Sequence, residues 1–181
     1  MAAAASKPAA APAPAWRPRM RLWQLFGLFV AGSIVLSAIA DWRSDHLLLI
    51  NTTDSLPNWA FLIQRHKLPA RGDYLFFDPP QSALLRRHFG AKPRMFGKIV
   101  YGMPGDTISH AGREVAGNGR TVAQMKPLTR FGEPLTPGAT GVVPPGCYFA
   151  ATPHKDGFDS RYAEIGFVCA RQVIGTGEPV L

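Results

Sequence analysis

Apolar and polar positions divide the chain into three parts. The first 16 residues are almost wholly Ala and Pro, a low-complexity composition that does not build a packed core. Leu22 to Ala40 then forms a run of 19 residues without a charge. As a helix it would be about 28 Å long, close to the hydrocarbon thickness of a bilayer. We therefore expect a disordered leader over 1–21, a transmembrane helix over 22–40 and one folded domain over 41–181.

The domain after the apolar segment is predicted to be mainly β. Short apolar runs rich in β-branched and aromatic residues alternate with turns rich in Gly and Pro. Asn118-Gly119 stands between two short arms that contain valine, a pattern typical of a hairpin with a type I′ turn. The absence of βαβ alternation and of internal repeats disfavours a parallel α/β sheet. Strands are expected at 47–50, 59–63, 74–77, 142–151 and 165–174, the hairpin at 112–123, and one short helix at 81–89.

Charges on either side of the apolar segment predict its orientation. Three arginines stand in the five residues before it, and Asp41 follows it. Lys and Arg are enriched on the cytoplasmic side of membrane helices, so the N-terminus is expected in the cytoplasm. The folded domain is then expected in the periplasm, anchored to the bacterial inner membrane by a single span. Ala38-Ile39-Ala40 also has the small-x-small form of a signal-peptide cleavage site, so the segment is either a retained anchor, which its length favours, or a cleaved signal.

Charge and side-chain chemistry narrow the classes of partner. The net charge is +8, and the first 40 residues hold four of the 20 basic residues and none of the 12 acidic ones. No later basic run is longer than Arg86-Arg87, so nucleic acid is not expected as a partner. The apolar segment makes a lipid bilayer an expected partner, and basic side chains of the domain could face anionic lipid headgroups. The five histidines lack metal-ligand spacing, and no metal or other cofactor is predicted. Cys147 and Cys169 both lie in predicted strands, and the sequence is equally compatible with a disulfide and with two buried thiols.

Candidate chemistry lies in three segments. Lys98 stands at the head of a short predicted apolar strand in the run Lys98-Ile-Val-Tyr-Gly-Met-Pro-Gly-Asp106. Burial there would lower its pKa and allow a neutral amine to act as a base. Pro104-Gly105 in that run predicts a type II turn. Ser55 lies on the turn after a predicted buried strand, and Asp159-Ser160-Arg161-Tyr162 places an acid and an arginine two residues apart. Each segment alone has a common structural explanation: an edge-strand lysine that reaches water, polar turn residues, and a structural ion pair.

Together, and in this order, the three segments resemble the motifs of the type I signal peptidases. In that family a nucleophilic serine follows a strand, a lysine base opens a K-x-x-x-G-x-P-G-D motif, and a D-S-R-Y motif supports the lysine. Ser55, the run from Lys98 to Asp106 and the run from Asp159 to Tyr162 match these motifs. The short S-x-P form, preceded by threonines, is similar to the TraF-type conjugative-transfer signal peptidases. The resemblance spans roughly 47–180 and implies a signal-peptidase-like β-sheet domain with one short helix.

The resemblance also implies a mechanism based on a Ser-Lys dyad. Ser55 would attack the scissile carbonyl, and Lys98 would take the serine proton, return it to the leaving amine and then activate water. The backbone N–H of Ser55 and the hydroxyl of Thr53 would bind the oxyanion. The substrate would be a membrane-inserted precursor with a signal peptide, in particular a pilin-like precursor of a conjugation or type IV secretion system. The sequence leaves open whether the product is linear or joined head to tail.

One departure from the family pattern affects the support of the lysine. Members usually carry a serine two residues before the aspartate of D-S-R-Y, and its hydroxyl helps to hold the lysine amine; here that position is Gly157. The hydrogen bond would then come from Ser160, a backbone carbonyl or water. A serine restored at position 157 is accordingly expected to leave activity equal or higher. Asp159 and Arg161 are expected to form an ion pair behind Lys98.

Two other interpretations remain open at this point. His154 would form a Ser-His-Asp triad with Ser55, although a loop histidine is more commonly solvated. The protein would otherwise be a non-catalytic, membrane-anchored assembly subunit of a secretion or conjugation apparatus, derived from such a peptidase. Gly157 favours this second interpretation, and the presence of Ser55, Lys98 and Asp159 disfavours it.

Overall fold

The computed structural model describes residues 21–53 and 55–180, so all but Arg21 of the expected disordered leader lies outside the described residues. The chain divides into two compact units that meet between Ala40 and Asp41. Helix α1 (Leu22–Asp45) has a window of mean hydropathy 1.9 and no buried side chain, as a membrane-spanning helix requires. It continues five residues beyond the predicted span, which ended at Ala40. The apolar pattern identifies only the segment that can lie in lipid. The helical backbone hydrogen bonds continue beyond it, through the more polar residues 41–45.

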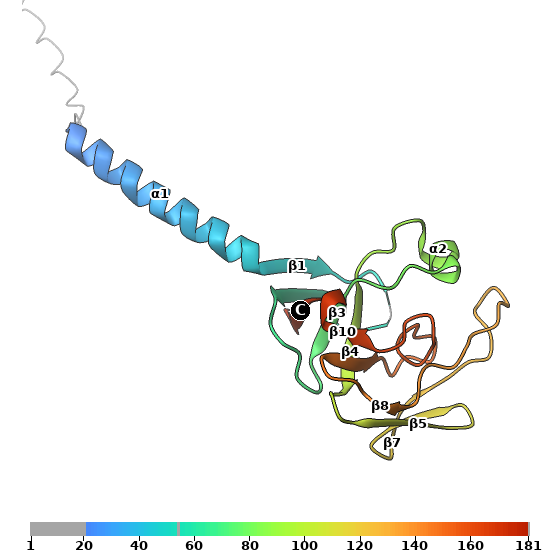
Figure 1. Ribbon diagram of the computed structural model, residues 1–181. Helices are drawn as coiled ribbons and strands as arrows, with labels where there is room; N and C mark the ends of the chain where they lie inside the picture. The colour runs from blue at the N-terminus through green and yellow to red at the C-terminus, as the bar shows by residue number, and fades with distance from the viewer. Residues whose placement is uncertain (1–20, 54, 181) are drawn as a thin grey trace, which may run out of the picture. The chain divides into compact units, whose positions relative to one another are not determined.

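The unit that begins at Asp41 is mainly β, as predicted, and contains two antiparallel sheets. The larger has seven strands in the order β1-β2-β11-β3-β4-β9-β10, and the smaller has four in the order β7-β6-β5-β8. Figure 1 shows β5, β7 and β8 grouped together, apart from β3. The strands are β1 (His46–Ile50), β2 (Ala60–Arg65), β3 (Tyr74–Phe77), β4 (Phe96–Gly102), β5 (Thr107–Ala111), β6 (Glu114–Gly117), β7 (Arg120–Gln124), β8 (Gly141–Val142), β9 (Cys147–Ala151), β10 (Val168–Cys169) and β11 (Val173–Pro179), with the helices α2 (Ala83–Phe89) and η1 (Ala170–Gln172).

Some boundaries differ from the prediction. Strand β4 begins at Phe96, so Lys98 is its third residue rather than its first. The expected strand 142–151 is two strands, because Pro144-Pro145 has no N–H to donate to a neighbouring strand. The expected strand 165–174 is divided into β10, η1 and the beginning of β11, and β5 was not predicted.

The two predicted turns are present and are joined to each other. Asn118 and Gly119 have φ values of 48° and 78°, which fit the type I′ turn between β6 and β7. Gly105 has φ of 88°, and the Asp106 N–H donates to the Met103 carbonyl at 3.0 Å, which fits a type II turn. The side-chain amide of Asn118 donates to Asp106 Oδ1 at 2.7 Å. The end of β4 is therefore tied to the hairpin of the smaller sheet.

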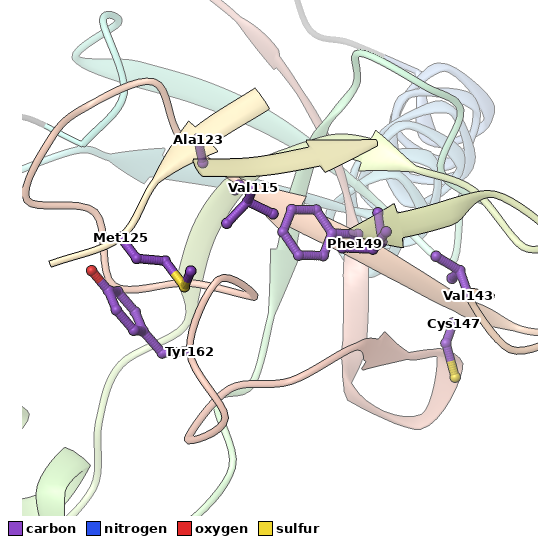
Figure 2. Packing of buried hydrophobic residues seen from close by; sticks show 9 residues of the cluster. Val115, Ala123, Met125, Val143, Cys147, Phe149 and Tyr162 are labelled. Carbon is purple, nitrogen blue, oxygen red and sulfur yellow. The ribbon is translucent and has the colours of Figure 1, made fainter. Parts of the chain in front are cut away.

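A shared core joins the smaller sheet to strand β9 of the larger one. Figure 2 shows Val115 of β6 pointing toward Phe149 of β9, with Ala123 of β7 above it. Both Val115 and Phe149 are fully buried. Because β9 pairs with β4, this packing braces the strand that carries Lys98. The buried members of the cluster are Ile108, Val115, Ala123, Met125, Val143, Cys147, Phe149, Ala151 and Tyr162.

Cys147 and Cys169 form a disulfide, which decides between the two states that the sequence left open. They are directly opposite each other in the pairing of β9 and β10. Their separation of 22 residues along the chain closes a loop that restricts the unfolded state. Such a restriction typically stabilises a fold by about 2–4 kcal/mol. The bridge therefore holds the edge strand β10 against β9.

Candidate active site

Lys98 is a buried lysine on a central strand. Along β4 the buried Lys98 and Val100 alternate with half-buried positions, and Lys98 is 5% exposed. Its amine lies 5.8 Å from the centre of the Phe96 ring, and none of residues 21–53 or 55–180 accepts a hydrogen bond from it. Desolvation lowers the pKa of Lys98; the charge of Asp159 opposes this shift and that of Arg161 adds to it. The shift is toward the neutral amine that a base requires.

The loop that carries Ser55 is folded around one asparagine side chain. The Asn51 amide nitrogen donates to the carbonyls of Leu56 at 3.2 Å and Asn58 at 2.9 Å. Its amide oxygen accepts from the backbone N–H of Thr53 at 3.0 Å and from the Thr53 hydroxyl at 2.9 Å. Thr53 Oγ1 also lies 2.9 Å from Ser55 Oγ. Since the Thr53 proton is directed at Asn51, Ser55 is the donor in the Ser–Thr pair.

Two contacts hold this loop against the strands beside Lys98. The hydroxyl of Thr152 donates to the backbone carbonyl of Ser55 at 2.5 Å. Leu56 Cδ1 lies 3.0 Å from the point where a Cβ on Gly97 would stand, so Leu56 covers the start of β4. The register of β4 and β9, extended by one residue, places Thr152 opposite Lys98 on the same face of the sheet. The structure thus brings Ser55 and Lys98 into one region, although they are far apart in sequence.

The predicted ion pair between Asp159 and Arg161 is present and fully buried. Arg161 Nε donates to Asp159 Oδ1 at 2.8 Å, and Nη2 donates to Oδ2 at 2.9 Å, a bidentate geometry with both side chains at most 1% exposed. Arg161 also donates to the carbonyls of Gln124 and Thr152. Asp159 Oδ2 accepts the Thr152 N–H at 3.0 Å. These partners compensate both charges and fix the end of β9, directly beside Lys98 in the sheet.

Ser160 has a different partner from the one suggested by the sequence. Its hydroxyl accepts the Ala150 N–H at 3.1 Å, and its own N–H donates to the Ala150 carbonyl at 3.0 Å. Within the described parts of the chain, Ser160 makes no hydrogen bond to Lys98. Its role in the structure is to hold the D-S-R-Y loop to β9.

The ring of His154 bonds within its own loop. Its ring Nδ1 accepts the Asp156 N–H at 3.2 Å, within its own loop, and no hydrogen bond links its ring to Ser55 in the described ranges. The triad interpretation therefore has no geometric support. No cluster of three or more His, Cys, Asp or Glu side chains suited to a metal occurs among the residues that the structure describes.

Position 157 has no room for a side chain. A Cβ on Gly157 would stand 2.3 Å from Cγ2 of Thr152, 2.8 Å from Asp159 Oδ2 and 2.9 Å from Arg161 Nη2. All three atoms belong to buried side chains that hydrogen bonds hold in place. These contacts argue against the expectation that a serine at 157 would keep or raise activity, because the substitution would displace the ion pair or Thr152.

Sequence reasoning missed two residues of the site. Asn51 organises the serine loop, and Thr152 connects that loop to the end of β9. Asn51 had a usable signal, since an Asn that directly follows a strand often folds the next turn with its side chain. For Thr152 the sequence held only an indirect signal. A glycine at 157, where the family pattern has a serine, indicates that a neighbouring side chain occupies the space, but not which one.

Comparison with known proteins assigns the chain to a family. Residues 20–181 match the family described as signal peptidase, peptidase S26. The chain belongs to this family. It is 27% identical over 176 residues to the conjugal transfer protein TraF of Agrobacterium fabrum, covering 91% of this chain and 96% of that protein. A signal peptidase I crystal structure from Enterococcus faecalis is 24% identical, with a TM-score of 0.38, and the match covers 61% of this chain and 97% of that one.

Membership of the S26 family assigns the chain a signal-peptidase-like function in a family of serine peptidases. Helix α1, which is long and apolar enough to cross a membrane, fits a membrane-anchored member.

Proposed function

We propose that this S26 protein is a membrane-bound serine endopeptidase that removes signal or leader peptides from exported precursors, with Ser55 and Lys98 as its dyad. The observation that carries the proposal is the buried Lys98 amine next to the strand that binds the serine loop. A desolvated amine that gives no hydrogen bond to a described residue loses its proton more readily than a solvated one. It can then accept a proton from a neighbouring hydroxyl.

The proposed reaction has two steps. Ser55 Oγ attacks the scissile carbonyl as its proton passes to Lys98 Nζ, and an ester forms between the serine and the acyl part of the precursor. Lys98 gives the proton to the leaving amine. It then takes a proton from a water that attacks the ester, and returns it to Ser55 Oγ as the ester bond breaks and the acid product leaves. The Ser55 N–H and the Thr53 hydroxyl stabilise the oxyanion, for which Thr53 turns its proton from Asn51 toward the substrate.

In this proposal the ion pair between Asp159 and Arg161 keeps the pKa of Lys98 from being raised by an unbalanced negative charge. A lone carboxylate beside Lys98 would stabilise the ammonium form and so block its action as a base. The bidentate Arg161 offsets the charge of Asp159 at close range. Asp159 can therefore order the loop through its hydrogen bonds to Thr152 and Arg161 without holding a proton on Lys98.

The proposed substrate is a pilin-like precursor of a conjugation or type IV secretion system. The short S-x-P serine motif and the similarity to a conjugal transfer protein support this choice. A non-catalytic assembly subunit is the competing function, and it rested on Gly157. That glycine now has a local steric explanation, so it no longer indicates a decayed site.

The disulfide supports the proposed localisation and provides a test of it. We propose that α1 anchors the protein in the inner membrane with its N-terminus in the cytoplasm, which leaves 41–181 in the oxidising periplasm. Thiol alkylation of whole cells after acid quenching and denaturation should then label neither Cys147 nor Cys169 without reductant, and both after reduction. Labelling of both thiols without reductant would contradict either the disulfide or the orientation. A reporter that is active only in the periplasm, fused after residue 181, decides which: an active reporter would leave the orientation intact and contradict the disulfide.

The peptidase assignment is tested with Ser55→Ala in the full-length protein purified in detergent. The wild type should cleave a signal-bearing pilin precursor, and the variant should lose at least about 10³-fold in rate. Its melting temperature should hardly change, because the hydroxyl contacts only Thr53 among the described side chains. Ser109→Ala, on an exposed position of β5, is the matched control and should cleave normally. A Ser55→Ala protein that restores conjugative transfer to a deletion strain would instead support the assembly subunit.

A further inference from the structure

Thr152 links three parts of the candidate site. Its hydroxyl donates to the Ser55 carbonyl at 2.5 Å and accepts the His154 N–H at 3.1 Å. Its backbone N–H donates to Asp159 Oδ2, and its carbonyl accepts from Arg161 Nη2. The residue is fully buried. In the described part of the chain, this is the one hydrogen bond that the Ser55 backbone receives from a distant segment, 97 residues away in sequence.

The methyl group of Thr152 has a second contact. It lies 2.3 Å from the point where a Cβ on Gly157 would stand, so it fills the space that a side chain at 157 would need. In the family pattern described above, a serine at that position supplies a hydroxyl to the site. Here the nearby hydroxyl belongs to Thr152, which directly follows β9. The register of β4 and β9, extended by one residue, places Thr152 opposite Lys98.

We propose that Thr152 is a positioning residue of the peptidase site, and that its methyl occupies the space beside position 157 where the family pattern has a serine. Its hydroxyl fixes the backbone of the nucleophile relative to Lys98, and its methyl excludes a side chain from position 157. The proposal rests on the proposed function for its kinetic part. Its steric part stands on the contacts of Thr152 and Gly157 alone.

The kinetic test compares two substitutions of Thr152 in the full-length enzyme. Thr152→Val keeps the shape but leaves the Ser55 carbonyl and the His154 N–H unpaired, so kcat should fall about 10- to 100-fold with KM nearly unchanged. Thr152→Ser loses only the methyl and should retain at least about a third of kcat. Thr176→Val is the matched control, because Thr176 is a buried threonine of β11 whose hydroxyl has no partner in the described structure. Its activity should equal that of the wild type.

The steric test uses thermal unfolding and so does not depend on catalysis. Gly157→Ala should lower the melting temperature, because its Cβ meets Cγ2 of Thr152. Adding Thr152→Ser removes that methyl and should restore part of the loss, whereas adding Thr176→Val should restore none. The contacts with Asp159 and Arg161 remain, so the rescue is incomplete.

The outcomes separate this proposal from the proposed function. Equal kcat for Thr152→Val and Thr152→Ser, in an enzyme that Ser55→Ala inactivates, would overturn the role of the hydroxyl and leave the peptidase assignment intact. Additive melting shifts for Gly157→Ala and Thr152→Ser would overturn the steric part. If Thr152→Val does not fold, Thr152→Ala gives the same comparison, since it also lacks the hydroxyl. Cleavage that survives Ser55→Ala would contradict the function itself, while the unfolding result still decides the Thr152–Gly157 contact.

Discussion

Lys98→Met should abolish precursor cleavage without destabilising the protein. Methionine matches the length of the lysine side chain but has no amine to take the Ser55 proton, so the rate should fall by at least about 10³-fold. The melting temperature at neutral pH should be equal or higher, because the substitution removes a desolvated amine from a site that is 5% exposed. Lys98→Arg should be equally inactive and also less stable, because a guanidinium cannot lose its proton to suit a buried site.

The lowered pKa of Lys98 also predicts two dependences on pH. Activity of the wild type should rise with pH as the amine loses its proton, and level off above the folded pKa. Between that pKa and the unfolded value of 10.5, the unfolded chain binds more protons than the folded one, so the free energy of unfolding rises with pH in this window. Lys98→Met should lack this contribution. Substantial cleavage by Lys98→Arg, or activity that falls as the amine deprotonates, would show that another group is the base.

Breaking the ion pair between Asp159 and Arg161 should cause the largest loss of stability of any single change considered for this protein. Both side chains are at most 1% exposed, so Arg161→Met leaves a buried carboxylate without its cation, and Asp159→Asn leaves a buried guanidinium without its anion. Each should cost about 3–5 kcal/mol, which corresponds to a melting temperature lower by roughly 10 °C. Lys67→Met is the control: its pair with Glu178 is exposed, and its loss should cost under about 0.5 kcal/mol.

The same two variants should move the pH profile of activity in opposite directions. Asp159 raises the pKa of Lys98 and Arg161 lowers it, after the larger effect of desolvation. Asp159→Asn should therefore shift the rise in activity to lower pH, and Arg161→Met should shift it to higher pH. The measurement is kcat/KM against pH below the melting temperature of each variant. Shifts in the same direction would mean that the pair acts on Lys98 only through packing.

Features that depend on a few consecutive residues were predictable from the sequence. The Asn118-Gly119 and Pro104-Gly105 turns have the φ values that their residues favour, and Asp159 and Arg161, two residues apart, form the expected pair. Ser55 and Lys98 were recognisable for the same reason, since each stands in a short motif. The apolar run of α1 was equally evident, although its polar last turn was not.

The tertiary structure alone decided which of these local features meet. The disulfide between Cys147 and Cys169 depends on the register of β9 and β10, and the position of Thr152 opposite Lys98 depends on the register of β4 and β9. A period-two pattern of apolar residues identifies a strand and its buried face, but not the partner or the register of that strand. Gly157 shows the consequence: its sequence position suggested a missing hydroxyl, and only the packing of Thr152 against it shows why no side chain fits there.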